Sequence, residues 1–467
     1  MISVATVETE KTARPVLLVV GVVTVFFLIL VDASGTIALR SAVSGYFGVG
    51  ADRAGLVYAC YFVAYAAPLL VAGRLGDRFG HRGVLLWSTA GFLLATLGAS
   101  LAGTFPLLLV TRVVQGLLGG IATPQLLSLL KLHVPARLRG AAMTAHGVVV
   151  VIAFFGGPAF AGVSTVLASW RLFYLGQVPL GLVALVLIAA ASGRVRPGVA
   201  ALDSPSAVMS FVFPLVICVG LLVGGANLTV CLLLIAAGAV VLLVFLRRQR
   251  ILPAQTVITP PRLFAVRDFS YASVVAVQLG FATTAMLAAV MQYLQADRGL
   301  GEVESGLILT PMAVLALLFA PVAARQTSRD REWYLVLAGF VLFALCMGFL
   351  ALRGGPGTPI VVLLGLSAVC GIASTCVFGA LSAVSIREVE PSLSGAASGL
   401  YNFGRQFGAA LGASMTVVLT QLRRGDGFWS FLPGTHAGPA LLVSTAVMIT
   451  GAITTAAALR AQRARRG

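Results

Sequence analysis

Four ionisable side chains lie within long apolar stretches of this 467-residue chain. Asp32, Arg112 and Arg405 lie well inside such stretches, and His146 lies near the start of another. A charge at bilayer depth costs at least a few kcal/mol, so an ionisable residue there is a functional candidate. Asp32 is the only acid at depth, and burial and a nearby arginine shift the proton affinity of a carboxylate in opposite directions. Asp32 is therefore a candidate for proton exchange within a membrane.

Three roles are open for Asp32. It exchanges protons if Arg112 or Arg40 approaches it in one conformation and withdraws in another. Alternatively, it forms a permanent salt bridge that holds helices together, or it binds a cationic substrate directly. Arg112 is correspondingly a partner of Asp32 or a contact for the substrate. We take proton coupling by Asp32 and Arg112 as the interpretation to test.

A short charged segment, residues 73–82 (GRLGDRFGHR), joins the second and third apolar stretches. Its glycines let two membrane helices approach closely and let the connection turn sharply. Its arginines hold it at a cytoplasmic, anionic membrane face. Asp77 can pair with those arginines or face the positive end of a neighbouring helix. The alternative is a short basic loop with an incidental aspartate. We interpret the segment as a conformational hinge that contains Gly73, Arg74, Gly76, Asp77, Arg78, Gly80 and Arg82.

Two further glycine sites are candidates for movement. Gly157 and Pro158 flatten and bend the fifth apolar stretch. Gly404, Gly408 and Gly412 recur every four residues and form a ridge for close helix packing. We expect both sites where two parts of the molecule roll against each other, and tight packing without movement is the alternative.

The composition indicates an all-α polytopic membrane protein. Hydrophobic residues make up 59% of the chain and charged residues 10%, and the mean hydropathy is +1.01. A soluble domain is about half apolar and a quarter charged. We expect about fourteen membrane-spanning helices, at residues 16–39, 53–74, 83–103, 105–131, 140–165, 170–192, 206–225, 228–246, 269–294, 304–324, 333–352, 358–384, 395–420 and 437–459.

The distribution of charge orients the chain. The net charge is +17, but most basic residues fall between alternate spans and at the end of the chain, as the positive-inside rule expects. We therefore expect both termini in the cytoplasm and no nucleic-acid partner. Six spans on each side of an inserted pair suggest two repeated halves with the site between them. The expected order is a cytoplasmic N-terminus (1–15), an N-terminal half (16–192), an inserted helix pair (206–246), a cytoplasmic linker (247–268), a C-terminal half (269–459) and a basic tail (460–467).

Several motifs resemble those of the major facilitator superfamily. The segment 73–82 resembles the loop between helices 2 and 3 of that family. Residues 112–120 (RVVQGLLGG) resemble its helix-four motif, and residues 156–162 (GGPAFAG) resemble its helix-five antiporter motif, with Ala161 replacing a glycine. Residues 170–181 and 398–408 resemble helices of the fourteen-helix drug:proton antiporter branch, with Gln177 where that branch has asparagine. Asp32 matches the aspartate of that branch's first helix, although the surrounding motif is degraded.

The resemblance implies a major facilitator fold with two six-helix halves plus two inserted helices. It places Arg112 beside the proton-carrying acid. It also implies a proton-coupled antiporter in a bacterial cell membrane that exports drugs, antibiotics or natural products. An uptake carrier or uniporter on the same fold is the alternative, disfavoured by Gly157-Pro158. We expect a monomer with an organic small-molecule substrate, protons and the lipid bilayer as its partners.

The sequence excludes other classes of function. It contains no Walker loop, HExxH motif or Ser/His/Asp set, so we expect neither an enzyme nor a cofactor. The six cysteines all lie in predicted spans without metal-site spacing, so we expect no metal. The predicted spans nine to fourteen contain no deep acid, and this favours neutral or anionic substrates over dications.

The substrate cavity is the least constrained part of the prediction. Aromatic side chains on the predicted spans can stack on a planar organic substrate, although most aromatics in such a chain face lipid or core. Arg405 lines the cavity or pairs with helix termini, and His146 relays protons or is a hydrogen-bonded interfacial histidine. The candidate cavity residues are Tyr61, Tyr65, Gln115, Phe155, Tyr293, Tyr401, Asn402, Arg405 and Gln406.

Overall fold

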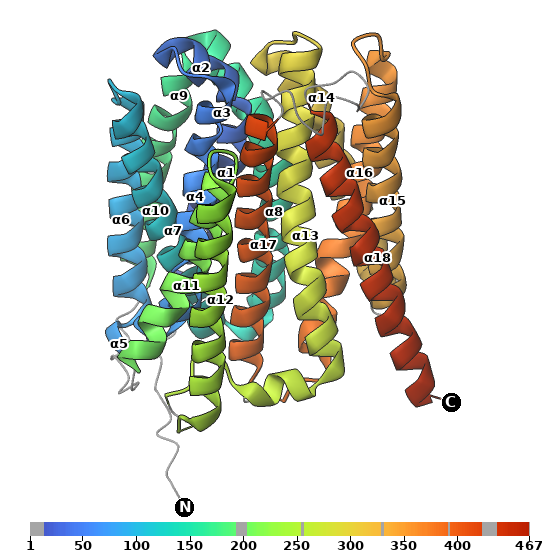
Figure 1. The fold of residues 1–467 in the computed structure, drawn as a ribbon. Coiled ribbons are helices and arrows are strands. Elements are labelled where there is room, and N and C mark those ends of the chain that lie inside the picture. Colours follow the sequence, from blue (N-terminus) through green and yellow to red (C-terminus); the bar gives the residue numbers. More distant parts are fainter. Residues whose placement is uncertain are drawn as a thin grey trace, which may run out of the picture.

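The computed structural model describes residues 14–192, 203–253, 256–327, 331–390, 393–422 and 437–466. These residues form long helices that run side by side through one bundle (Figure 1). The first half contains α1 (Pro15–Ala38), α2 (Arg40–Phe47), α3 (Ala51–Ala54), α4 (Leu56–Ala66), α5 (Leu69–Phe79), α6 (His81–Ser100), α7 (Phe105–His133), α8 (Ala136–Leu167), α9 (Trp170–Leu175) and α10 (Gln177–Ala191).

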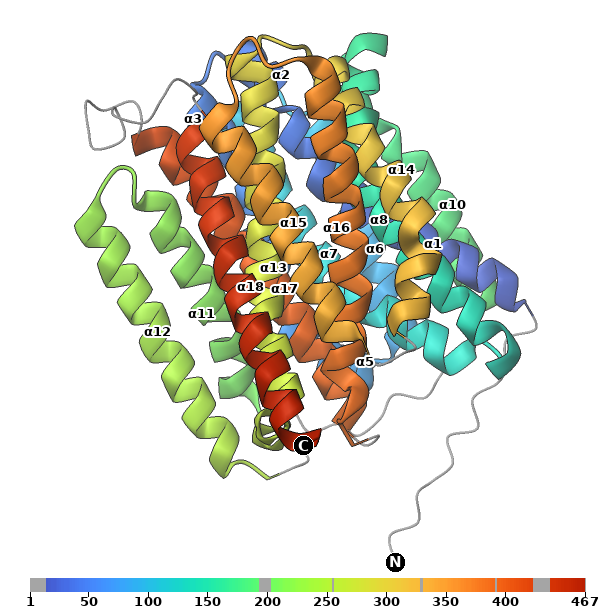
Figure 2. The ribbon, with the colours of Figure 1, turned by 90° about the vertical axis from the view of Figure 1, so that its right-hand side faces the viewer.

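The remaining helices form the inserted pair and the second half. The pair is α11 (Ser204–Val223) and α12 (Leu228–Ile251), and Figure 2 shows it at one side of the bundle. The second half contains the short helix η1 (Pro261–Ala265), α13 (Arg267–Gln292), η2 (Tyr293–Asp297), α14 (Glu302–Thr327), α15 (Glu332–Arg353), α16 (Ile360–Arg387), α17 (Ser394–Leu422) and α18 (Gly438–Arg466).

Within the described residues, twelve helices are long and apolar enough to cross a membrane. The pair Ala51–Ala66 and Leu69–Phe79, bent by 51°, brings the number to thirteen. Pro68 lies at the break. Proline has no backbone N–H to donate to the preceding turn, so the helical hydrogen bonds are interrupted there. The helix α17 has 29 residues, which is long enough to span, but it is rich in glycine and polar residues and is not among the thirteen. The fourteen predicted spans are therefore not clearly reached.

Two faces of the bundle serve as reference below. The linker face carries residues 256–266 and the end of α18, at the bottom of Figure 1. The far face carries α2 and η2, at the top of the same view. Most of the arginines at helix ends lie on the linker face, for example Arg78, Arg248 and Arg387.

The two halves meet along two pairs of helices, α8 with α14 and α4 with α17. Near the far face the first contact is so close that a Cβ at Gly162 would lie 2.5 Å from the carbonyl oxygen of Glu302. A Cβ at Gly306 would lie 2.7 Å from the Pro158 carbonyl oxygen. Across the same face, Gln295 Nε2 donates to the Ala38 carbonyl oxygen at 2.7 Å. These contacts close the far face of the bundle.

The inserted pair packs through α11 on α17 of the second half and on α4 and α5 of the first half. The Phe213 ring of α11 lies 5.7 Å and 6.0 Å, centroid to centroid, from the rings of Phe403 and Phe407 on α17. At the linker face, Arg248 donates two hydrogen bonds to Asp203, at 2.7 and 2.8 Å. These bonds hold the pKa of the Asp203 carboxyl well below its usual range, so the pair stays ionised at neutral pH.

Candidate functional site

A buried ion pair lies inside the first half. Asp32 on α1 and Arg112 on α7 have no exposed side-chain surface, and Arg112 Nη1 donates to Asp32 Oδ2 at 2.5 Å. A buried charge is tolerated only when it is paired and hydrogen-bonded. The structure therefore brings together the two residues that the sequence singles out for proton coupling.

Further polar groups surround the guanidinium of Arg112. Its Nη1 also donates to Gln115 Oε1 at 2.7 Å, and its Nε donates to the Val57 carbonyl oxygen at 3.2 Å. Gln115 Nε2 in turn donates to Thr96 Oγ1 at 2.8 Å. The guanidinium carbon lies 4.3 Å from the ring centroid of Tyr61, which is within the range of a cation–π contact. Arg112 thus has several partners besides Asp32.

The other carboxylate oxygen of Asp32 faces Gln177. Gln177 Nε2 lies 3.4 Å from Asp32 Oδ1 and also donates to the Phe173 carbonyl oxygen at 3.0 Å. One nitrogen of the guanidinium, Arg112 Nη2, and the amide oxygen of Gln177 are buried without a hydrogen-bond partner in the described residues. Because these two atoms have no partner in the described part of the chain, each can form a new hydrogen bond if the bonds between Asp32 and Arg112 change.

Glycines on α7 and α8 let the helices around this cluster approach one another closely. Gly116 and Gly120 follow Arg112 on the same side of α7, and a Cβ at either would overlap a backbone carbonyl of α4. The close approach of α7 to α4 lets Arg112 reach the carbonyl of Val57. On the other side of α1, a Cβ at Gly157 would lie 3.0 Å from the backbone nitrogen of Gly35. Glycines thus hold α1 between its neighbours.

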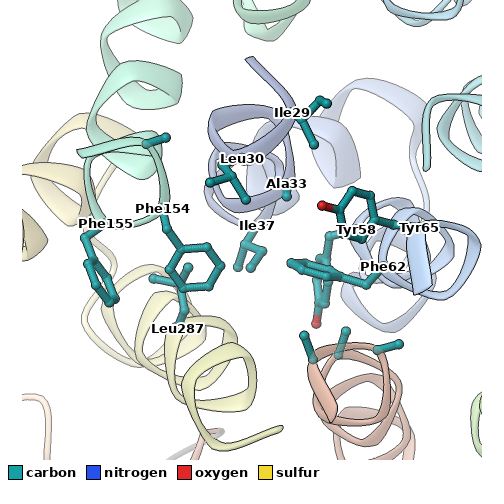
Figure 3. Packing of buried hydrophobic residues seen from close by; sticks show 14 of the residues in the cluster. Ile29, Leu30, Ala33, Ile37, Tyr58, Phe62, Tyr65, Phe154, Phe155 and Leu287 are labelled. Carbon is teal, nitrogen blue, oxygen red and sulfur yellow. The ribbon is translucent and has the colours of Figure 1, made fainter. Parts of the chain in front are cut away.

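A second feature is a small central cavity between the halves, with a volume of about 20 Å³. Its walls come from α1 and α8 of the first half and from α13, α16 and α17 of the second. Figure 3 shows Phe154 and Phe155 of α8 near this boundary, with Leu287 of α13 facing them. The lining residues are Leu30, Val150, Val151, Phe154, Phe155, Gly280, Thr283, Thr284, Phe378, Arg405, Gln406 and Ala409.

The predicted cavity residues fall into three groups. Phe155, Arg405 and Gln406 line the central cavity. Tyr61 and Gln115 belong to the ion-pair cluster instead.

The third group makes contacts elsewhere. The Tyr65 and Thr123 hydroxyls lie 2.8 Å apart, and Tyr293 OH donates to the Gly355 carbonyl oxygen at the far face. Asn402 Nδ2 donates to the Ser398 carbonyl oxygen on its own helix, and Tyr401 is buried. None of these four appears in the cavity wall.

The segment 73–82 differs in form from the predicted loop. It is helical up to Phe79, and Gly80 alone joins α5 to α6 with φ +86°. Only glycine adopts such a backbone readily, so this one residue makes the turn. The connection is tighter than the sequence suggested because both flanking helices continue to the glycine.

The partners of the predicted hinge residues also differ. Asp77 pairs with His81 Nε2 at 3.3 Å rather than with an arginine, and His81 Nδ1 lies 2.7 Å from Gln125 Oε1 of α7. Arg82 donates to Ser192 Oγ at 3.0 Å, which ties α6 to the end of α10. Arg74 Nη2 donates to the Val257 carbonyl oxygen at 2.5 Å and so reaches the linker between the halves. In the described residues, no ion pair joins Arg78 to an acid, and this guanidinium lies over the Phe79 ring.

The two glycine sites lie in different places. Gly157 and Pro158 lie on α8, whose far-face end contacts α14 of the other half. Gly408 and Gly412 instead pack on α13, where a Cβ would overlap the carbonyl oxygens of Val277 and Phe281. Gly404 has more room, with its nearest neighbour at 3.4 Å. Because α13 and α17 belong to the same half, the ridge does not lie between the halves as the sequence interpretation placed it.

Some polar groups near the site were missed. Gln177, Thr96 and Tyr174 complete the ion-pair cluster, and of these only Gln177 carried a sequence signal, because it occupies a motif position. At the linker face, Arg387 bridges Asp268 at 2.5 Å and Glu332 at 3.1 Å, which ties the ends of three helices of the second half.

Comparison with known proteins agrees with this architecture. The pattern of the Major Facilitator Superfamily matches residues 22–413. An uncharacterized MFS-type transporter of Mycobacterium tuberculosis is 31% identical over 397 residues, which are 85% of this chain and 69% of that protein. The tetracenomycin C resistance and export protein of Streptomyces glaucescens is 30% identical over 379 residues, 79% of this chain and 69% of that protein. The solved structure of an auto-inhibited POT family peptide transporter matches with a TM-score of 0.67, covering 94% of this chain and 96% of that one at 12% identity, which is a likeness of fold alone.

Proposed function

We propose that this chain, which belongs to the major facilitator superfamily, is a proton-coupled antiporter that exports amphipathic organic compounds from the cytoplasm. The observation that carries this proposal is the fully buried Asp32–Arg112 pair, joined at 2.5 Å. Among the described residues, Asp32 is the only carboxylate more than one turn from both ends of a spanning helix. A buried acid in that position is the natural carrier of a proton through the protein.

The surroundings of Arg112 make proton uptake by Asp32 feasible. Protonation of Asp32 would turn the ion pair into a weaker hydrogen bond. An arginine without other partners would then be a buried, uncompensated charge, which destabilises the fold. Here the guanidinium keeps the Gln115 and Val57 oxygens and the Tyr61 ring. The unpartnered amide oxygen of Gln177 is a further acceptor within the same cluster. The protein can therefore hold Asp32 in either protonation state.

Coupling requires that the pair meet water from only one side at a time. In this structure neither side chain is exposed, and the far face is closed by the contacts of α8 with α14. We assign proton loading to a conformation in which these contacts open. The segment 73–82, which reaches the linker through Arg74, is the proposed hinge at the opposite face.

Topology and direction complete the proposal. We assign α17 as the fourteenth span, since its 29 residues pack along α13 and α4. The arginine-rich linker face is then cytoplasmic, as in the positive-inside rule, and the membrane is that of a bacterial cell. Export is supported by the relative named as a tetracenomycin C resistance and export protein. The central cavity, of about 20 Å³ here, lies between the halves and would widen for a substrate when the halves move apart.

The test uses inverted membrane vesicles energised to an acidic interior, with a quenched pH-sensitive dye. Tetracenomycin C, the compound named for the relative, should be taken up and should release protons from vesicles that contain the wild-type chain. Asp32→Asn should abolish both signals at equal protein level, and Glu390→Gln, which neutralises an exposed acid, should retain both. Proton release that persists in the Asp32→Asn vesicles would reject Asp32 as the carrier. Accumulation in right-side-out cells instead would make the chain an uptake carrier.

A further inference from the structure

A single unpaired arginine stands in the wall of the central cavity. Among the described residues, the Arg405 guanidinium has no ion pair and no hydrogen bond, and its carbon lies 5.8 Å from the centroid of the Phe378 ring. None of the described residues that line this cavity is an acid. Elsewhere in the bundle, Arg112, Arg248 and Arg387 each bind a carboxylate. Arg405 differs from these three, and it lines the space between the halves where a substrate would lie.

A half-buried histidine lies near the cavity but outside its wall. His146 on α8 lies one turn before the cavity residues Val150 and Val151 and is not among the residues that line the cavity. Its ring stacks on Phe26 at 4.2 Å, and its Nδ1 is buried without a hydrogen-bond partner in the described part of the chain. Among the described residues, the cavity wall therefore holds one basic group, Arg405.

The rest of the wall is apolar and aromatic. Phe155 and Phe378 come from opposite halves, with ring centroids 6.4 Å apart and planes at 85°. Phe154 stands edge-on to Phe155 at 5.3 Å. Rings in this arrangement pack against a planar organic group. The hydroxyl of Thr284 is buried in the same wall without a partner among the described residues. It can therefore donate a hydrogen bond to a neutral acceptor on the ligand.

We propose that the central cavity selects amphipathic aromatic monoanions, with the acidic group at Arg405 and the rings against Phe154, Phe155 and Phe378. The proposal rests on the proposed transport function and names its substrate class. A cation would meet Arg405 with no acid to offset the repulsion. An anion would supply the missing partner for Arg405, and hydrogen bonds to charged groups are among the strongest in proteins.

The test compares three ligands of one shape. Anthracene-2-carboxylate, its neutral amide and the cationic 2-(aminomethyl)anthracene are measured by equilibrium dialysis at pH 7.5 against the full chain in lipid nanodiscs, with empty nanodiscs subtracted. We expect the carboxylate to bind about tenfold tighter than the amide, and the cation to bind most weakly. Equal binding of the carboxylate and the amide, tightest binding of the cation, or no measurable binding of the carboxylate would each overturn the proposal.

Variants then locate the anion site. Arg405→Gln should remove about tenfold of the carboxylate affinity and leave the amide within about twofold. Arg405→Lys should retain part of it, because the charge remains without the forked geometry. Arg463→Gln, at a surface arginine that contacts Tyr334, is the matched control and should change nothing. Equal weakening of the carboxylate and the amide by Arg405→Gln would show a packing effect and overturn the assignment.

These measurements need neither a proton gradient nor a direction of transport. If the vesicle experiment showed uptake or uncoupled transport, the proposed function would fail while the ligand preference stood. If coupled export were found but the cation bound best, only the substrate class would fail. Should Arg405→Gln not fold, the comparison of the three ligands on the wild-type chain and on Arg405→Lys still decides the question.

Discussion

At the scale of single residues, the decisive fact is that the Asp32–Arg112 pair is embedded in neutral polar groups. A buried salt bridge is by itself weak evidence for stability, because desolvation offsets much of the attraction. Here neutral polar groups form hydrogen bonds to both charged side chains: Gln115 and the Val57 carbonyl accept from Arg112, and Gln177 donates to Asp32. These bonds link α1, α4, α7 and α10. Such a cluster can hold the helices together, and it can also accept a proton.

The two roles separate in a double variant. Arg112→Ala leaves Asp32 buried without its counter-ion and should destabilise the folded protein by about 3–5 kcal/mol. Combining Asp32→Asn with Arg112→Gln removes both charges and should restore much of the thermal stability in detergent, while proton-coupled transport stays absent. Recovery of transport in the double variant would mean that the pair is only structural.

Conserving the charge alone should give an intermediate result. Arg112→Lys can keep one hydrogen bond to Asp32, but a single ammonium cannot also reach the Val57 carbonyl and stack on Tyr61. We expect reduced but measurable transport, at vesicle expression matched to wild type. Activity equal to wild type would indicate that only the charge of Arg112 matters.

The sequence identified this pair because deep charges are rare in membrane helices, and Asp32 and Arg112 stand out in any hydropathy plot. It could not identify Thr96 or Tyr174, since single hydroxyls are common in such helices and their contacts depend on packing. The sequence also assigned Tyr61 and Gln115 to the substrate cavity. They line the ion pair instead, because the rotation of α4 and α7 about their axes is fixed by the glycines at positions 116 and 120.

At the scale of helices, close backbone contacts decide which substitutions are tolerated. A Cβ at Gly408 would overlap the Val277 carbonyl oxygen, and a Cβ at Gly280 would overlap the Arg405 carbonyl oxygen. The two helices therefore approach through glycines on both sides, within one half. The four-residue repeat of glycines predicted the close packing correctly, but spacing alone cannot say which helix lies opposite.

Even alanine should be harmful at Gly408. Its methyl group would meet backbone rather than a movable side chain, so α17 must shift away from α13 and the second half should lose thermal stability. Gly404→Ala, one turn earlier with 3.4 Å to its nearest neighbour, is the matched control and should be nearly neutral. Thermal unfolding of both variants in detergent checks this. Equal stability of the two would contradict the packing described here.

A bulky residue at the contact between the halves should act differently. Gly306→Val would place a side chain against the Pro158 carbonyl and Ala159, so the far face could not close as it does here. We expect a folded protein whose backbone amides near residues 299–303 exchange hydrogen faster than in wild type, with transport lost. Gly301→Ala, whose Cβ would meet Glu304 Oε2 at an ordinary contact distance of 3.9 Å, is the control. Unchanged exchange in the valine variant would show that this contact does not govern closure.

At the scale of the whole molecule, the sequence predicted the class of fold because hydropathy and loop charge reflect the bilayer directly. The all-helical bundle and the family are confirmed. The sequence predicted about fourteen spans, whereas thirteen are found among the described residues, because α17 has the length of a span but many small and polar residues. The sequence predicted which residues form the inserted pair but not which helix they pack against. Its packing against α17 depends on single rings such as Phe213.

The proposed substrate charge has a consequence for the membrane potential. Export of a monoanion in exchange for one incoming proton moves two charges in the same electrical sense, and each charge is worth about 2.3 kcal/mol per 100 mV. A potential that is negative inside would then drive export even without a pH gradient. With a neutral substrate one charge moves, and with a monocation the exchange is electroneutral.

Current recorded from proteoliposomes on a solid support can distinguish these cases. We expect anthracene-2-carboxylate to give a transient current about twice that of its amide per molecule transported, since two charges move instead of one. The Asp32→Asn variant should give no proton-coupled current with either ligand. Electroneutral transport of the carboxylate would mean that the anion and the proton cross the membrane in the same direction, which is incompatible with the export of an anion in exchange for one proton.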